Sequence, residues 1–481
     1  YSSPYPISEK LFFASYSPEM HGHQGNAGAD NNLDKNGGVN PRDVYKVYLV
    51  FNYNGKAYRE PIFDPGPGVS AFSPTPVRPR PVPPVMPSML PENPEDKTGV
   101  YYVQNVYDSV HKIEPGSIKY LRINALYNQP TPRVPHRSWI MDEVMKGVVG
   151  TVPVNEDGSV AFRIPAETAV QLQLLDAEKK CVMNMRSFIY LQPGESASCA
   201  GCHDDRMKSP PQVNYGKMEV QIPKPVPGPE TLKGFRYMAT VQPVWDRHCI
   251  SCHGLDKTEK DVNLTGTYTE RDPERYPNGK VRMAMSYDYL IRNPKFYKMM
   301  DRNCETSFST PKDYLSGAST FPDFLKKHIK DRNLPFTVGE WERVISWLDV
   351  NGQFYGDYSF NRAENREPDP AGEKALRDYV KQLFGEKIAA QPFAALVNNG
   401  ETSESRILKM SLAITAGGWD GGTQPRWKSK DNPEYVRMVQ LVEASLKPLP
   451  FADRNFACGH GDKCRCGACW VKDFEQKYPR K

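Results

Sequence analysis

Cys199-Ala200-Gly201-Cys202-His203 and Cys249-Ile250-Ser251-Cys252-His253 repeat one short pattern. Each stretch has the form C-x-x-C-H, which attaches a c-type haem. Two thiols at this spacing can reach the two vinyl groups on one porphyrin edge and form thioethers, and the adjacent imidazole then lies where it can bind iron. The alternative is a pair of C-x-x-C zinc knuckles that happen to precede histidines. The spacing predicts two c-type haems, attached through Cys199 and Cys202 and through Cys249 and Cys252.

The composition of the chain excludes several classes of protein. The chain has 481 residues with 62 basic and 57 acidic side chains, which gives a formal net charge of +5. Because these charges are interspersed, the sequence contains no basic stripe suited to nucleic acid. No apolar run approaches the roughly 18 residues that a membrane-spanning helix needs. We therefore expect neither nucleic-acid binding nor a membrane span.

The start of the chain and the haem motifs bear on where the protein works. The sequence opens at Tyr1 without an initiator methionine or the regions of a signal peptide, so we expect a processed or truncated product. Haem attachment through thioethers is normally completed outside the cytoplasm. We therefore expect the periplasm or an equivalent extracytoplasmic compartment, in which disulfides can also form.

The first half of the chain is rich in predicted strands. Residues 1–65 contain strands and an Asn54-Gly55 hairpin turn, and we interpret them as the end of a larger, propeller-like β domain. Residues 66–99 form a proline-rich linker that favours extended polyproline II. Residues 100–235 predict a β-sandwich-like middle domain that carries the first haem motif. Candidate strands cover residues 11–16, 44–51, 100–107, 148–154, 159–164 and 169–175.

The second half of the chain changes to helical periodicity. Residues 236–450 predict an α-helical, cytochrome c-like domain that carries the second haem motif. Within it, Thr337-Val338-Gly339-Glu340 forms a capping box that opens a helix, and Gly352 lies just past the end of that helix. Residues 451–481 form a cysteine-rich tail. The expected fold class is therefore multidomain β plus α.

The second haem has more than one candidate for its sixth ligand. His253 is the expected proximal ligand, and His328 lies on a predicted helix from which it could bind the opposite side of the iron. Alternatively, His328 is a solvated residue on a lysine-rich face. His248 adjoins Cys249 and is expected to face away from the ring in a structural role. A methionine ligand would raise the haem potential, and the candidates are Met283, Met285, Met299 and Met300.

The first haem has no obvious second histidine. His203 is its expected proximal ligand, and Met207 and Tyr215 follow closely enough to be considered for the other side of the iron. Asp204 and Asp205 could move protons or bind haem propionates, which makes them the candidate catalytic residues. The alternative for these two carboxylates is a solvated turn.

Several further cysteines lie outside the haem motifs. Cys181 and Cys304 are expected to be buried single thiols. The tail could hold one tetrahedral zinc ion or form two disulfides, and the disulfides are slightly favoured because exported thiolates tend to oxidise. A third haem is not expected, because Trp470 stands where a motif histidine would be. The candidate tail ligands are Cys458, His460, Cys464, Cys466 and Cys469.

The chain resembles the alpha subunit of hydrazine synthase and its relatives, which are dihaem proteins. The similarity runs from about residue 40 to 470. It rests on the two haem motifs together with a set of short stretches. These are Ser73-Pro74, Arg78-Pro79-Arg80-Pro81, Leu121-Arg122, Gly150-Thr151-Val152-Pro153-Val154, Asp157-Gly158-Ser159, Met185-Arg186-Ser187, Pro193-Gly194-Glu195, His248 and the cysteine tail.

The resemblance implies an N-terminal β-propeller, a middle β domain with an active-site haem, and a C-terminal cytochrome c domain. It implies bis-histidine ligation of the C-terminal haem, which fits His253 with His328. It also implies that the first motif histidine, His203, binds zinc and that a tyrosine one turn later binds iron. Carried over to this sequence, His203 would be the zinc or iron ligand, and Met207 stands at the tyrosine position. Further cytochrome or redox subunits are the implied partners.

These observations lead to one functional hypothesis and two alternatives. In the first, the chain is a dihaem oxidoreductase whose first haem reacts with small nitrogen compounds, with Asp204 or Asp205 assisting proton transfer. The second haem then transfers electrons. In the alternatives, the chain is a non-catalytic electron carrier with two six-coordinate irons, or a structural subunit of a multihaem complex.

Overall fold

The computed structural model describes most of the chain. The protein consists of two compact units, Tyr1–Ser88 and Met89–Lys481. The described residues are 2–17, 45–66, 69–77, 79, 90, 97–127, 145–202, 218–254, 259–271, 281–293, 295–300, 310–356 and 366–448.

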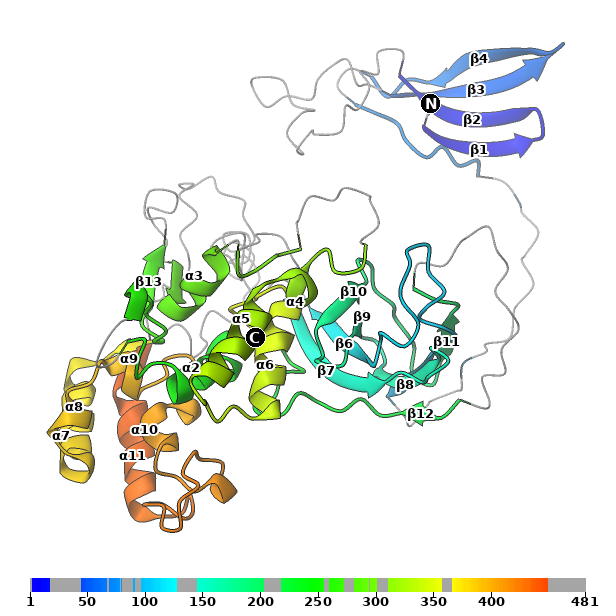
Figure 1. Ribbon diagram of the computed structural model, residues 1–481. Coiled ribbons are helices and arrows are strands. Elements are labelled where there is room, and N and C mark those ends of the chain that lie inside the picture. Colours follow the sequence, from blue (N-terminus) through cyan, green and yellow to red (C-terminus); the bar gives the residue numbers. More distant parts are fainter. Residues whose placement is uncertain are drawn as a thin grey trace. The chain divides into compact units, whose positions relative to one another are not determined.

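The first unit contains one antiparallel sheet in which neighbours in sequence are neighbours in space, in the order β1-β2-β3-β4 (Figure 1). The predicted hairpin turn is present, since Asn54 and Gly55 both have positive φ, at 48° and 77°. The sheet is consistent with a blade of a propeller, and that larger fold stays a prediction. The strands are β1 (Ser2–Ser8), β2 (Leu11–Tyr16), β3 (Lys46–Tyr53) and β4 (Lys56–Phe63).

The second unit begins with two four-stranded sheets, ordered β10-β9-β6-β7 and β11-β5-β8-β12. Side chains from both sheets form one hydrophobic core, which includes Tyr101, Ile123 and Phe162. The strands predicted over residues 100–107, 148–154, 159–164 and 169–175 are present as β5, β7, β8 and β9, whereas the sequence pattern did not predict β6, β10, β11 and β12. The strands are β5 (Thr98–Val103), β6 (Tyr120–Tyr127), β7 (Met145–Pro153), β8 (Val160–Pro165), β9 (Val170–Leu175), β10 (Cys181–Asn184), β11 (Ser196–Cys199) and β12 (Val220–Gln221).

One predicted strand is shorter than expected. The strand predicted over residues 100–107 ends at Val103. Beyond it, the backbone N–H groups of Gln104 and Asn105 donate to the carbonyl oxygens of Cys199 and Ala200, both at 3.0 Å. These bonds hold the chain beside the first haem motif. The predicted strand therefore does not continue beyond Val103.

A group of helices follows and packs around buried aromatic side chains, including Tyr237, Trp245 and Trp347. The predicted capping box is present: the Thr337 hydroxyl accepts from the Glu340 N–H, and the Glu340 carboxylate accepts from the Thr337 N–H. No helix in the described chain is long and apolar enough to cross a membrane. The elements are α1 (Tyr237–Thr240), α2 (Gln242–His248), η3 (Glu259–Asp261), β13 (Tyr268–Arg271), β14 (Val281–Ala284), α3 (Met285–Arg292), α4 (Leu315–Ala318), α5 (Phe321–Asp331) and α6 (Val338–Asp349).

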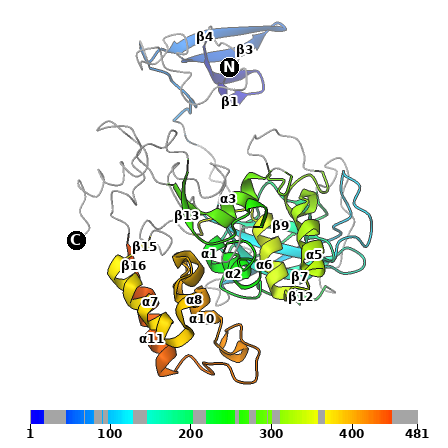
Figure 2. The ribbon, with the colours of Figure 1, turned by 60° about the vertical axis from the view of Figure 1, so that its left-hand side comes forward.

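The remaining helices form a hydrophobic core of their own, around Leu376, Trp427 and Met438. In this core α7 and α11 lie side by side (Figure 2). The region predicted as one helical domain thus contains two hydrophobic cores. The predicted domain boundaries stay predictions. The elements are α7 (Pro370–Phe384), α8 (Glu386–Ala389), α9 (Phe393–Leu396), η5 (Thr402–Glu404), α10 (Arg406–Lys409), η6 (Ile414–Ala416), α11 (Pro433–Ala444) and the paired strands β15 (Arg366–Pro368) and β16 (Leu446–Pro448).

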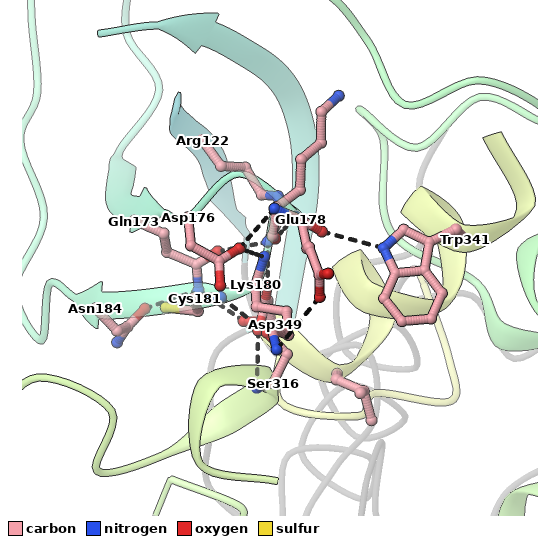
Figure 3. A network of polar contacts seen from close by, with 12 residues as sticks. Arg122, Gln173, Asp176, Glu178, Lys180, Cys181, Asn184, Ser316, Trp341 and Asp349 are labelled. Carbon is pink, nitrogen blue, oxygen red and sulfur yellow. Dashed lines mark hydrogen bonds and ion pairs between the residues drawn. The ribbon is translucent and has the colours of Figure 1, made fainter. Parts of the chain in front are cut away.

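A buried ion pair joins the sheets to the first group of helices (Figure 3). Arg122 on β6 contacts Asp349 at the end of α6, with Nη1 and Oδ2 2.5 Å apart and both side chains fully buried. Neighbouring groups complete the network: the Gln173 amide donates to the Asp349 carbonyl at 2.7 Å, and the Ser316 N–H donates to Oδ1 at 3.0 Å. The pair therefore fixes how β6 and α6 meet.

Removing one partner of this pair is expected to destabilise the fold. Arg122→Met leaves the Asp349 carboxylate buried without its cation, which typically costs about 3–5 kcal/mol. The double variant Arg122→Met/Asp349→Leu removes both charges and is expected to recover much of that loss. Urea unfolding of the haem-loaded protein measures both effects.

The exposed pair of Lys374 and Asp378, 2.8 Å apart, is the matched control. Lys374→Ala is expected to change the free energy of unfolding by less than about 1 kcal/mol. Equal stability of Arg122→Met and the unmodified protein would show that the buried pair does not hold the two parts together.

Candidate haem sites

The second haem motif borders a cavity of about 450 Å³, within the range of cofactor-binding pockets. Cys249 and His253 line one side of it, and His328 on α5 lines another. Apolar and aromatic side chains form most of the remaining wall, as a porphyrin requires. These are Trp245, Val262, Leu264, Tyr289, Leu290, Phe296, Phe321, Phe324 and Leu325.

The two histidines face each other across a short gap. The centres of the His253 and His328 rings are 6.2 Å apart, with an angle of 47° between the ring planes. Two imidazoles that bind one metal through bonds of about 2 Å have ring centres about 6 Å apart. His253 Nδ1 is also buried without a hydrogen-bond partner in the described chain. This geometry fits one iron atom between the two rings.

Local interactions hold each histidine in place. The chain turns tightly after α2, so that the N–H groups of Cys252 and His253 both donate to the Cys249 carbonyl, at 3.1 and 2.9 Å. The His253 carbonyl then accepts from Leu264 N–H at 2.8 Å. One turn before His328 on α5, the Phe324 ring stacks on the imidazole at 16°. Both rings are therefore positioned by the protein itself.

The methionines considered as ligands lie elsewhere. Met283 is fully buried in the aromatic core, and the Met300 sulfur accepts from the Asn184 amide at 3.2 Å. Met285 begins α3, and Met299 packs against the aromatic core. None of these four residues is among the described residues that line the cavity. The structure brings His328, and not a methionine, to face His253.

His248 contacts a buried carboxylate instead of the cavity. Its Nε2 lies 3.1 Å from Glu340 Oε1, and Arg247 Nη1 lies 2.9 Å from the same oxygen. Burial opposes ionisation of Glu340, but hydrogen bonds from His248 and Thr337 outweigh it and lower the pKa of Glu340 to about 2. The start of α6 is thereby tied to the residue that precedes Cys249.

The first haem motif lies at the edge of a sheet. Cys199 ends β11, which pairs in parallel with β5. The Cys202 N–H donates to the Asp108 carbonyl at 3.0 Å, and a side chain at Gly201 would collide with that same carbonyl. Cys199 and Cys202 both pack against the core between the two sheets. The motif thus needs its glycine for packing against the loop that follows β5.

The four described motif cysteines, Cys199, Cys202, Cys249 and Cys252, form no disulfide, and neither does the predicted buried thiol of Cys181. Burial raises the pKa of Cys202 to about 12 and that of Cys249 to about 12. Both groups are therefore protonated at neutral pH in the polypeptide without haem. No disulfide within either motif competes with haem attachment.

Several predicted site residues lie outside the described residues. These are His203, Asp204, Asp205, Met207, Tyr215, Cys304 and the tail residues Cys458, His460, Cys464, Cys466 and Cys469. Among the residues that are described, no three His, Cys, Asp or Glu side chains are grouped so that they could hold a metal ion. The zinc site and the ligands of the first iron stay predictions.

Sequence reasoning did not identify all residues of the second site. Lys260, Asp331 and Arg332 line the cavity and bring charged groups to it. Phe324 could have been found from its position four residues before His328, since residues at that spacing share one face of a helix. No local sequence pattern indicates that Lys260 lines the cavity, because Lys260 lies on η3, far from α5 in sequence.

The middle part of the chain matches a known family. Residues 116–204 match the family model described as hydrazine synthase alpha subunit middle domain. The matched segment contains strands β6 to β11 and the whole first haem motif. The chain is therefore hydrazine synthase alpha-like over this segment, and the resemblance predicted from the sequence is confirmed there.

Comparisons of whole chains give weaker similarity. A chain of the solved structure of Kuenenia stuttgartiensis hydrazine synthase is 15% identical, with a TM-score of 0.48. The alignment covers 74% of this chain and 55% of that chain, so this protein spans about half the length of that relative. No curated protein matches the chain.

Glu340→Gln is expected to destabilise the protein in a pH-dependent way. The folded pKa of Glu340 is about 2, below its ordinary value of 4.5, so its stabilising effect is complete above pH 4.5 and is lost as pH falls toward 2. At pH 7 the variant should be less stable by about 2 kcal/mol. Chemical unfolding at several pH values measures the difference.

The exposed carboxylate of Glu386, paired with Lys381, provides the control for this experiment. Glu386→Gln should have little effect at any pH. If the loss in Glu340→Gln were the same at pH 3 and pH 7, ionisation of Glu340 would not be its cause.

Proposed function

We propose that the chain is a dihaem c-type cytochrome oxidoreductase resembling the hydrazine synthase alpha subunit. The observation that carries this proposal is the placement of His253 and His328, with ring centres 6.2 Å apart, on the cavity beside Cys249. A match to the middle domain of that subunit, which includes the first haem motif, supports the same class.

The second site suits electron transfer. When bound there, a haem supplies an iron that changes its charge by one electron, and two strong protein ligands leave it no open position for substrate. His253 and His328 would hold the iron. Phe321 and Phe324 would exclude water from the ring. Lys260 and Arg332, which line the cavity, would bind the anionic propionates.

The first site is the candidate for reaction with small nitrogen compounds. Cys199 and Cys202 would attach the haem, and His203 would bind its iron or a zinc ion. Met207 would be a further candidate ligand of that iron. Asp204 and Asp205 would assist proton transfer, because carboxylates beside a reacting centre can accept and return protons.

A non-catalytic role is the alternative. With His253 and His328 as its ligands, the second iron would have no place for substrate. If Met207 also saturates the first iron, the chain would be an electron-transfer or structural subunit of a multihaem complex. In both cases we expect other cytochrome or redox subunits as partners, an extracytoplasmic location, and a tail that holds zinc or disulfides.

Haem attachment is expected to depend on the motif cysteines. The protein, matured in cells that attach c-type haem, should carry the mass of two haems. The variant Cys249→Ala/Cys252→Ala should carry one, since each motif supplies both thioethers of its haem. Intact-protein mass spectrometry measures this directly. Cys181→Ala is the control and should keep both haems, whereas an unmodified chain without added haem mass would contradict the proposal.

His328→Ala is expected to change the spin state of the second iron. Loss of a strong axial ligand opens a position on the iron, so a high-spin ferric signal should appear in the EPR spectrum at the expense of a low-spin one. Met299→Leu is the control and should leave the spectrum unchanged. If Met299→Leu, and not His328→Ala, removed the low-spin signal, the proposed ligand pair would be wrong.

The reactivity of the first iron distinguishes the proposed oxidoreductase from the electron-carrier alternative. In the unmodified protein, a high-spin signal that shifts on addition of hydroxylamine, nitric oxide or cyanide is expected if a substrate binds there. Two low-spin signals that do not respond to these ligands would favour the electron-carrier alternative.

A further inference from the structure

A second cavity, of about 390 Å³, lies where α2, α6 and α10 approach one another. Neither the cysteines nor the histidines of the haem motifs line it. Its wall combines cationic and acidic side chains with the glycine-rich turn at Gly417 and Gly418 and the Trp419 ring. The charged residues are Arg247, Arg343, Lys409, Glu340 and Glu404.

Two of the three cations are already paired. Arg247 Nη1 lies 2.9 Å from Glu340 Oε1, and Lys409 Nζ lies 2.7 Å from Glu404 Oε1. The second oxygen of Glu340, Oε2, accepts from the N–H and the hydroxyl of Thr337, at 2.8 and 2.9 Å. Both oxygens of Glu340 are therefore occupied. With three cationic and two acidic side chains in its wall, the cavity has one cation in excess.

Arg343 is that extra cation. Its guanidinium makes one long contact, from Nη1 to the Thr240 carbonyl at 3.5 Å. Its Nε is buried and has no hydrogen-bond partner in the described chain. Burial lowers the pKa of Arg343, because a charge removed from water is less stable unless another group compensates it. An unpaired donor of this kind is a place where an anion would bind favourably.

The backbone holds the Arg343 side chain in position. Gly228 has a φ of +122°, and a Cβ at this residue would lie 3.0 Å from the Arg343 Cδ. The chain at Gly228 and Pro229 therefore passes closely over the guanidinium stem and forms part of the cavity wall. A side chain held in this way loses little conformational freedom when it binds a ligand, which favours binding.

We propose that this cavity binds an inorganic oxyanion of the phosphate or sulfate class. The planar fork of a guanidinium matches two oxygens of such an ion, and charge-assisted hydrogen bonds are stronger than neutral ones. Arg343 supplies the unpaired Nε donor, and the excess of one cation over the two carboxylates makes the cavity attractive to an anion. This site is independent of the proposed haem chemistry.

The experiment is a titration of the haem-loaded protein with inorganic phosphate, followed by calorimetry at constant ionic strength. The unmodified protein should bind phosphate saturably, with about one ion per chain, and sulfate should compete. Arg343→Gln should weaken binding tenfold or more, as expected for loss of a charge-assisted contact. The exposed Arg437→Gln is the matched control and should bind like the unmodified protein.

A second variant keeps the test decisive if Arg343→Gln does not fold. Glu404→Gln removes one carboxylate from the cavity and should tighten phosphate binding several-fold. Absence of saturable binding by the unmodified protein would overturn the proposal. Unchanged affinity in Glu404→Gln, or equal affinity in Arg343→Gln and Arg437→Gln, would also overturn it.

Discussion

The buried contact between Arg122 and Asp349 fixes the arrangement on which the rest of the second unit depends. The two residues are separated by 227 positions in sequence and lie 2.5 Å apart. Burial of two charges is costly, and neighbouring groups offset part of that cost: Asp349 accepts from Ser316, and Arg122 donates to Gln173 and to the Lys179 carbonyl. Arg122 Nε is buried without a partner in the described chain. A shift of β6 against α6 would leave these groups buried without partners. The sheets and the helices therefore have one favourable relative position.

Helix α6 carries this constraint to the second haem motif. Asp349 ends the helix at the sheet, and Glu340, in the first turn of the helix, binds His248 and Arg247 just before Cys249. A single helix thus connects the sheets that carry the first haem motif to the loop that carries the second. Both oxygens of the Glu340 carboxylate are occupied. Arg343, one turn further along α6, contacts no carboxylate in the described part of the chain. One residue therefore supports the haem site and defines the excess charge of the neighbouring cavity.

The two haem motifs are held by different means. Cys199 and Cys202 lie at a sheet edge, where Gly201 allows the loop at Asp108 to approach. Cys249 and His253 follow a helix, and a second helix brings His328 to the opposite side of the cavity. A site between two helices can supply two strong iron ligands, one from each helix. At a sheet edge, a second ligand has to come from another segment of the chain. This difference agrees with the distinct roles proposed for the two haems.

Short-range patterns determined what could be read from the sequence. The C-x-x-C-H motifs, the capping box at Thr337 and Glu340, the Asn54-Gly55 turn and strands such as β2, β3 and β9 depend on residues close together in the chain, so spacing alone predicts them. Other features depend on contacts between distant residues. The facing of His253 and His328, the pairing of Arg122 with Asp349 and the division of the helices into two cores follow from how whole elements pack. No local pattern records those contacts, because the free energy that selects them comes from burial and charge pairing across the folded chain.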